Sequence, residues 1–350
     1  MIPFLDLKKL NAPYKEVLTA AFKNTLHKGD YILGDAVTRF ENEFADYCGT
    51  KYCIGTGNGF DALQLIFDGY KRLGKLNEGD EVLMAANSYI ATVLAILHAG
   101  LKPVFVEIET STFNMDIEQL PEPDSSIKAI LITHLYGQLG PVTAIADYAQ
   151  KHNLLFIEDA AQAHGATLDT KKAGSFGDVG WFSFYPTKNM TTSEGGIITT
   201  NDEKIANLCK ILRAHGMTAQ YQHTEFGYNY RMTDISAAIG RVQLEKLSNF
   251  NSRRREIANI YNEKLSNYVE APKNRRGHVF HQYTILCKER NQLKDHLNAK
   301  GVGSGIYYPT LLYDYAPMSE FVADCPNAKR LTDMALSLPV HPALSNSDVS

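Results

Sequence analysis

Lys188 is the residue of this sequence whose position most favours chemistry. It lies within residues 183–189, directly after the apolar run 179–182. A lysine at the end of a buried strand is unusual, because removing an ammonium group from water is costly. Burial lowers the pKa of a lysine and turns its free amine into a nucleophile for carbonyl groups. We therefore predict a Schiff-base lysine; the alternative is an ordinary surface lysine in a loop.

Asp159 follows the apolar run 154–157, earlier in the chain than Lys188. In an open parallel sheet, ligands bind at the carboxyl ends of the strands, and we expect Asp159 to lie there. A buried carboxylate requires a cationic partner. If the ligand is pyridoxal phosphate, the partner is its protonated ring nitrogen, and Asp159 keeps the ring an electron sink. The alternative is that Asp159 caps a following helix.

Residues 54–63 read as a strand, a glycine turn and the start of a helix. The exposed N–H groups at such a helix N-terminus bind anions, and Ser183 would add a hydroxyl group. The glycines at 55, 57 and 59 lack the Gly-x-Gly-x-x-Gly spacing of a dinucleotide-binding turn. We therefore favour a phosphate site here over a nicotinamide site, with a plain tight turn as the alternative.

Tyr89 follows the apolar run 81–84 and would present an aromatic ring at the end of another strand. Such a ring stacks on a flat ligand, although an ordinary core aromatic is the alternative. A lysine nucleophile, a carboxylate, an anion site and an aromatic ring at successive strand ends together predict one specific ligand site, which would suit pyridoxal phosphate.

Short apolar runs that alternate with helical stretches are expected to position these residues. The alternation predicts a mainly parallel sheet of the α/β class, covered by helices on both faces. The expected strands are 52–55, 81–84, 103–106, 129–132, 154–157, 180–183 and 196–199, and expected helices include 60–69, 90–99 and 142–152.

The pattern changes after about residue 234. Residues 235–247 and 253–265 read as two helices, and a strand is expected at 280–285. We predict a large domain of residues 1–240 and a smaller α+β domain of residues 241–350. Residues 344–350 read as the start of a helix with its capping residues, so the natural protein is expected to continue beyond them.

Composition excludes several classes of protein. The 350 residues carry a formal net charge of −4 without a long basic run, which disfavours nucleic-acid binding. No stretch reaches the ~18 apolar residues of a membrane span, and the N-terminus lacks a signal-peptide pattern, so we expect a cytoplasmic protein. The five cysteines are scattered, which predicts reduced thiols and neither a disulfide framework nor a metal site.

Taken together, these motifs resemble the DegT/DnrJ/EryC1/StrS family of pyridoxal-phosphate-dependent nucleotide-sugar aminotransferases. The similarity runs over nearly the whole chain and is carried by residues 2–7, 157–162, 183–189, 193–196 and 227–232. It implies the fold type I architecture, with a seven-stranded, mainly parallel sheet between helices. It also implies a homodimer with a shared active site, glutamate as amino donor, and two half-reactions in one site.

The resemblance also implies roles for individual residues. Lys188 and Asp159 match the catalytic lysine and the partner of the ring nitrogen. Cofactor contacts are implied for Gln162 beside the ring hydroxyl, for Tyr89 as the stacking ring, and for a phosphate site made of Gly59, Phe60, Asp61 and Ser183. Asn229 matches a residue that reaches the phosphate of the other subunit. His164, Tyr185 and Tyr308 are candidate substrate contacts, with His281 as a further one.

The motifs point to the family more clearly than to the sugar carbon that is aminated. Segments 52–63, 86–92 and 163–166 look most like enzymes that aminate C3 of a dTDP-3-keto-6-deoxyhexose. Segments 186–189 and 193–196 are closer to C4-aminating relatives, so amination at C4 is the alternative. A sugar dehydratase of similar fold is disfavoured, because such relatives replace the lysine by histidine or cluster their cysteines. A non-catalytic sensor that binds the cofactor is a further alternative, which the intact Lys188 and Asp159 disfavour.

Overall fold

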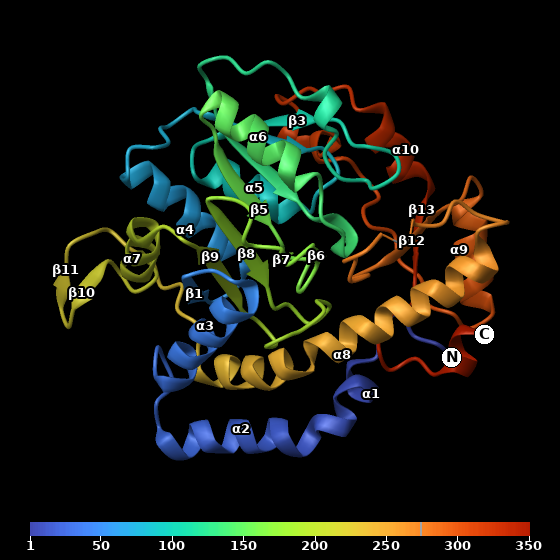
Figure 1. Ribbon diagram of the computed structural model, residues 1–350, viewed down its shortest axis with the longest axis horizontal. Coiled ribbons are helices and arrows are strands. Elements are labelled where there is room, and N and C mark those ends of the chain that lie inside the picture. Colours follow the sequence, from blue (N-terminus) through green and yellow to red (C-terminus); the bar gives the residue numbers. More distant parts are fainter. Residues whose placement is uncertain (274) are drawn as a thin grey trace.

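A seven-stranded sheet forms the centre of the computed structural model, which describes residues 1–273 and 275–350 (Figure 1). Only β9 runs antiparallel to its neighbours in this sheet. The prediction of a mainly parallel sheet is therefore confirmed, and each predicted strand is present. In sheet order the strands are β1 (Tyr52–Thr56), β9 (Gly196–Thr200), β8 (Val179–Ser183), β5 (Leu155–Asp159), β4 (Ile127–Thr133), β2 (Glu81–Ala85) and β3 (Lys102–Val106).

Helices cover both faces of this sheet, as the α/β prediction requires. One apolar core joins α4 (Gly59–Arg72), α5 (Ile90–His98) and α7 (Glu203–Leu212) to one face. The opposite face packs against α3 (Asp35–Cys48) and α6 (Val142–His152). Alternate residues of a strand point to opposite faces, so Ile157 lies in the first core and Phe156 in the second. Both faces are therefore buried, which explains why these strands are apolar almost throughout.

The strand register brings the functional ends of the strands together. Asp159, the last residue of β5, is level with Thr133 on β4 and with Trp181 on β8. The loop that carries Lys188 connects β8 to β9. The carboxyl ends of the parallel strands therefore meet at one edge, where the sequence places the reactive residues.

A single helix, α8 (Asp234–Leu265), replaces the two helices that the sequence predicts at 235–247 and 253–265. Residues 248–252 include two serines and two asparagines, which favour a break, but neither proline nor glycine. Phe250 and Asn251 are buried there, so packing sustains the helix. Asn251 also donates a hydrogen bond to the carbonyl oxygen of His164 and accepts one from Asn189. Tertiary contacts thus override the local propensity.

The part of the chain that follows α8 builds a smaller layer. Its apolar core gathers residues of β12 (Tyr283–Leu286), β13 (Ala335–Leu338) and the second half of α8. Ile2 pairs with Val302, so the N-terminal end lies in this layer too. We propose the division near residue 240 as a domain boundary that α8 crosses without interruption.

The remaining elements are short or peripheral. The sequence predicts the beginning of a helix near residue 345, and α11 begins there with Ser345 as its cap. All five cysteines are free thiols and four of them are buried. No helix in the described ranges is long and apolar enough to cross a membrane. The short or peripheral elements are α1 (Leu7–Asn11), α2 (Lys15–Lys28), α9 (Arg290–Ala299), α10 (Pro326–Met334), α11 (Asn346–Val349), β6 (Thr167–Leu168), β7 (Lys171–Lys172), β10 (Met217–Ala219), β11 (Gln222–His223), and the 3-10 turns η1 (Ala12–Tyr14), η2 (Ile117–Gln119), η3 (Leu135–Gly137), η4 (Leu312–Asp314) and η5 (Ala316–Met318).

We predict that Asn251→Leu lowers the free energy of unfolding by about 1–3 kcal/mol, because it leaves the buried His164 carbonyl without its donor. The exposed Asn249, two residues earlier on the same helix, provides the matched control. Asn249→Leu should change stability by less than about 0.5 kcal/mol. Denaturant unfolding of both variants measures the difference, and equal effects would contradict the role of Asn251.

Candidate active site

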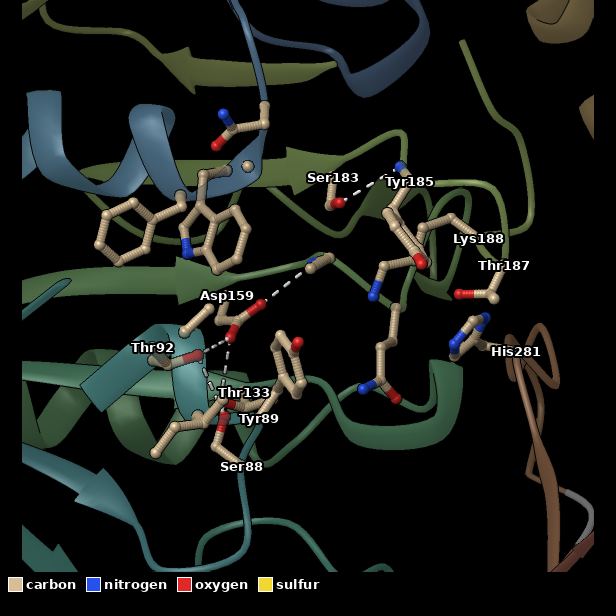
Figure 2. Close-up of a pocket in the computed structure, with 18 of the residues that line it drawn as sticks. Ser88, Tyr89, Thr92, Thr133, Asp159, Ser183, Tyr185, Thr187, Lys188 and His281 are labelled. Atoms are coloured by element: carbon tan, nitrogen blue, oxygen red, sulfur yellow. Dashed lines mark hydrogen bonds between the residues drawn. The ribbon is translucent and has the colours of Figure 1, made fainter. Parts of the chain in front are cut away.

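A cavity of about 490 Å³ opens at the carboxyl ends of the parallel strands (Figure 2). Its wall comes from the loops after β2, β5 and β8, from the first residues of α4 and α5, and from two segments of the smaller layer. It is lined by Asn58, Gly59, Phe60, Ser88, Tyr89, Ile90, Ala91, Thr92, Leu94, Thr133, Asp159, Ala161, Gln162, Trp181, Ser183, Tyr185, Thr187, Lys188, Glu194, His281, Gln282, Tyr307 and Tyr308.

Lys188 lines this cavity on a tightly held loop. Its backbone N–H donates to the carbonyl oxygen of Tyr185, and the side chain of the next residue, Asn189, donates to Asn251 and to the carbonyl of Val279. Loss of hydration lowers the pKa of Lys188 to about 8, and the charge of Asp159 opposes this only in part. About a tenth of its amine is therefore unprotonated at pH 7, far more than for an ordinary lysine, and only the free amine is a nucleophile for carbonyl groups.

Asp159 faces the same cavity from the end of β5 and is held from two sides. One carboxylate oxygen accepts hydrogen bonds from Thr92 at 2.9 Å and Thr133 at 3.4 Å, and the other accepts from the Ala161 N–H at 3.1 Å. Burial raises the pKa of Asp159, while these hydrogen bonds and the charge of Lys188 oppose the rise. No helix follows directly, so the alternative of a helix cap is wrong.

The first turn of α4 forms the anion site that the glycine turn predicts. Asn58 caps the helix by accepting a hydrogen bond from the Asp61 N–H at 2.9 Å. A Cβ atom on Gly59 would lie 2.7 Å from Trp181 and 2.9 Å from Ser183, so only glycine lets the helix end approach β8 this closely. The amides of Gly59 and Phe60 have no partner within residues 1–273 and 275–350, and they line the cavity near Ser183.

Asp61 has no free backbone N–H for the phosphate contact that the resemblance implies. Its N–H is already bound by Asn58, and its side chain is absent from the cavity wall. Burial raises the pKa of its carboxyl group to about 6. Asp61 therefore belongs to the frame of the anion site, and the amides of Gly59 and Phe60 are the free donors.

Gln162, Tyr308 and Tyr89 form the opposite wall. The Gln162 side-chain oxygen accepts a hydrogen bond from the Tyr136 N–H at 2.8 Å, and its amide nitrogen donates to the Tyr308 hydroxyl at 3.2 Å. Tyr89 is 50% exposed and lies over the cavity, with its ring centroid 5.5 Å from that of Tyr308. Gln162 is thus fixed in orientation, and Tyr89 offers a ring face to a flat ligand.

His164 and Asn229 lie outside the cavity wall. His164 is fully buried, packed against Phe182 and Phe184, so we correct its assignment as a direct substrate contact. Asn229 is exposed and accepts a hydrogen bond from the Arg231 side chain. Its implied role is in the other subunit, and that role stays a prediction. Tyr185 does line the cavity, as expected of a substrate contact.

Thr92, Thr133 and Ser88 are functional residues that the sequence prediction left out. Ser88 lies between the two threonines, with its hydroxyl 3.2 Å from Thr92 and 3.1 Å from Thr133. Thr133 ends β4, level with Asp159, so the rule that placed Asp159 at a strand end also selects Thr133. No such signal marks Thr92, whose position depends on how α5 packs.

The cavity fits pyridoxal phosphate group by group. Lys188 supplies an amine without an ion-pair partner in the described chain, and Asp159 a buried carboxylate for a cationic ring nitrogen. The free amides of Gly59 and Phe60, with the Ser183 hydroxyl, suit the phosphate. No group of three or more His, Cys, Asp or Glu side chains in the described residues could hold a metal ion.

Comparison with known proteins gives a consistent match. The model of the DegT/DnrJ/EryC1/StrS aminotransferase family matches residues 14–350. A dTDP-3-amino-3,6-dideoxy-alpha-D-galactopyranose transaminase of Aneurinibacillus thermoaerophilus is 40% identical, over 100% of this chain and 97% of that protein. A protein of Geobacillus stearothermophilus named pleiotropic regulatory protein is 37% identical, over 98% and 94%. The crystal structure of a DegT DnrJ EryC1 StrS aminotransferase from Brucella abortus superposes with a TM-score of 0.95 at 32% identity, covering 100% and 96%.

We predict that Gly59→Ala weakens binding of pyridoxal phosphate at least about tenfold, because the added methyl group pushes the helix end away from Ser183. Asp61→Asn is the control, since it keeps the N–H that Asn58 binds and removes only a charge outside the cavity. Titration of the cofactor into the apoprotein, followed by absorbance, measures both. Equal affinity in Gly59→Ala and the wild type would contradict this account of the anion site.

Proposed function

Because this chain belongs to the DegT/DnrJ/EryC1/StrS aminotransferase family, we propose that it transfers an amino group from glutamate to C3 of a dTDP-linked keto-6-deoxyhexose. The chain is a pyridoxal-phosphate-dependent aminotransferase of nucleotide sugars, and the amino donor, the sugar and its nucleotide are the proposal. The observation that supports the aminotransferase chemistry is the juxtaposition of Lys188 and Asp159 in one cavity, an amine with a pKa of about 8 and a buried carboxylate. The sugar and its nucleotide are proposed from the 40% identical transaminase.

Pyridoxal phosphate, when bound, supplies a carbonyl carbon that reacts with amines and a ring that delocalises the electrons of an adjacent C–H bond. The side-chain amine of Lys188 would hold the cofactor in the resting enzyme. Once free, this amine would act as general base and then as general acid, and it would hold the proton that the reaction moves. Two substrates thus use one site in turn, and the same lysine serves both half-reactions.

Asp159 controls the electronic state of the ring. Its carboxylate would hold a protonated ring nitrogen and so stabilise negative charge that develops next to the ring. Thr92, Thr133 and the Ala161 amide prevent the carboxylate from turning toward Lys188. Gln162, fixed by Tyr136, is placed to contact the ring hydroxyl, and Tyr89 covers the ring face.

Amination at C3 follows the 40% identical transaminase, whose name specifies a 3-amino-3,6-dideoxy sugar linked to dTDP. Amination at C4 is the alternative, since segments 186–189 and 193–196 look closer to C4-aminating enzymes. The test runs the reaction in reverse with 2-oxoglutarate as acceptor. The enzyme should deaminate dTDP-3-amino-6-deoxyhexoses and leave the 4-amino isomers unchanged; the opposite preference would move the site of amination to C4.

A second subunit is part of this proposal. Five large apolar residues are exposed along and just after α2, and Tyr221 and Phe226 are exposed at 83% and 92% on and beside the β10–β11 hairpin. This hairpin projects away from the rest of the molecule (Figure 1). Burying such surfaces against another copy is favourable. We propose a homodimer in which Asn229 contacts the cofactor phosphate of the partner, working in the cytoplasm on sugars for a surface polysaccharide.

One observation favours a regulatory protein, namely the name of the 37% identical relative. A sensor needs only to hold the cofactor, whereas the buried carboxylate of Asp159, which keeps the ring an electron sink, serves chemistry. Tyr185, His281 and Tyr308 also line the cavity and offer contacts to a second molecule. These features support turnover, so catalysis is our conclusion.

We predict that Lys188→Ala and Lys188→Arg lower turnover by about 10²–10⁴-fold or more, because neither side chain can carry the proton between the two carbons. Lys172→Ala, which removes a lysine packed over Tyr47, is the control and should retain activity. Formation of the amino sugar measures turnover, and borohydride reduction followed by mass spectrometry shows cofactor attachment. Normal turnover of Lys188→Ala would overturn the mechanism.

The rate at which added pyridoxal phosphate attaches to the apoprotein should rise with pH around a midpoint of about 8. The folded-state pKa of Lys188 is lowered from 10.5 to about 8, so the reactive free amine is populated above that pH and lost below it. Stopped-flow absorbance between about pH 6 and about pH 10 follows the reaction. A midpoint near that of an ordinary lysine would show that burial does not activate Lys188.

A further inference from the structure

Arg254 is a buried cation that none of the functions described above uses. It lies on α8 and is only 3% exposed. Its guanidinium donates to the backbone carbonyls of Phe280 and His281, at 3.1 and 3.2 Å, and its Nε has no partner in the described part of the chain. Buried arginines are almost always paired with an anion, because an uncompensated buried charge is costly.

Among the described residues, no compensating charge lies around Arg254. Burial alone lowers the pKa of its guanidinium, to about 10, and no carboxylate in residues 1–273 or 275–350 opposes that shift. The group is nevertheless fully charged at neutral pH. Backbone carbonyls supply partial negative charge only, so the guanidinium retains the capacity to bind a full anion.

A small side cavity adjoins Arg254. It is lined on one side by Arg254 and His341, and it shares Thr187, His281 and Tyr307 with the main cavity. No acidic residue of the described chain contributes to its wall. His341 is oriented by its Nε2–H, which donates to the carbonyl oxygen of Pro3 at 3.3 Å. With a volume of about 20 Å³, the side cavity admits one water-sized group, such as a single carboxylate oxygen.

We propose that Arg254 binds the side-chain carboxylate of the amino donor and thereby selects a dicarboxylic amino acid. The inference rests on the proposed aminotransferase function. The α-carboxylate of any donor is attached to the reacting carbon and must stay close to Lys188. Arg254 lines only the side cavity, beyond Thr187 and His281, so it meets a carboxylate that is separated from the amine by further carbon atoms. Glutamate has such a group, and alanine does not.

The donor half-reaction tests this directly, because it can be followed without any sugar as the cofactor absorbance changes in a single turnover. In Arg254→Gln, kcat/KM for glutamate should fall at least about tenfold, which is the loss of one charge-assisted hydrogen bond. The slow reaction with alanine should not change, and Arg254→Lys should restore part of the preference. Equal losses for glutamate and alanine would overturn the proposal and leave Arg254 a structural role.

The neighbouring Arg255 supplies the matched control. It lies on the same helix, donates to Ser252 and is absent from the walls of both cavities. Arg255→Gln removes the same charge and should leave the ratio of glutamate to alanine reactivity unchanged. A similar shift in both arginine variants would show a general electrostatic effect and sink the assignment to Arg254.

Binding of glutarate, a dicarboxylate without an amine, gives a readout independent of catalysis. Calorimetry should show at least about tenfold weaker binding to Arg254→Gln than to the wild type. Since Arg254→Gln loses contacts to two backbone carbonyls, His341→Phe is a second variant that narrows the side cavity and leaves those contacts intact. His341→Phe should weaken the binding of glutarate too. Unaltered glutarate binding in both variants would overturn the proposal. If the wild-type enzyme reacts with glutamate but forms no amino sugar, the proposed sugar acceptor is contradicted, whereas the role of Arg254 is not.

Discussion

The structure depends on keeping two opposite charges close together without letting them neutralise each other. Asp159 and Lys188 share one cavity, yet hydroxyl groups and a backbone amide hold the carboxylate, while the amine has no ion-pair partner in the described chain. A direct buried ion pair would remove both groups from chemistry. Keeping two buried charged groups unpaired costs free energy. Contacts from the surrounding elements β4, β5, β8 and α5 offset that cost.

That frame extends well beyond the sheet. Gly59 allows the end of α4 to contact β8, and Asn251 of α8 fixes the loop that carries Lys188 through its hydrogen bond with Asn189. A buried ion pair between Arg213 and Glu41 connects α3 to β1. Glu41 accepts a hydrogen bond from the Gly55 N–H, and Arg213 donates one to the Gly55 carbonyl oxygen. The positions of the reactive atoms thus depend on contacts between segments that are far apart in the sequence.

The sheet, its flanking helices and most of the cavity wall could be predicted from the sequence, because strand ends are marked by local patterns such as the apolar run before Asp159. Other features depend on packing that leaves no local trace. The continuity of α8 through residues 248–252 follows from burial of Phe250 and Asn251. The roles of Thr92 and Arg254, and the displacement of His164 from the cavity, likewise depend on which face of an element meets its neighbours.

Because α8 is unbroken, it fixes the spacing between two parts of the active centre. Asn251 and Arg254 are three residues apart and lie on the same side of the helix, one directed to the Lys188 loop and the other to the side cavity. An α-helix turns by about 100° per residue, so inserting or deleting one residue between them would swing one contact away from its target. A change of side chain at Asn251 or Arg254 therefore affects one contact, whereas a change of length in this segment of α8 would break the alignment of both.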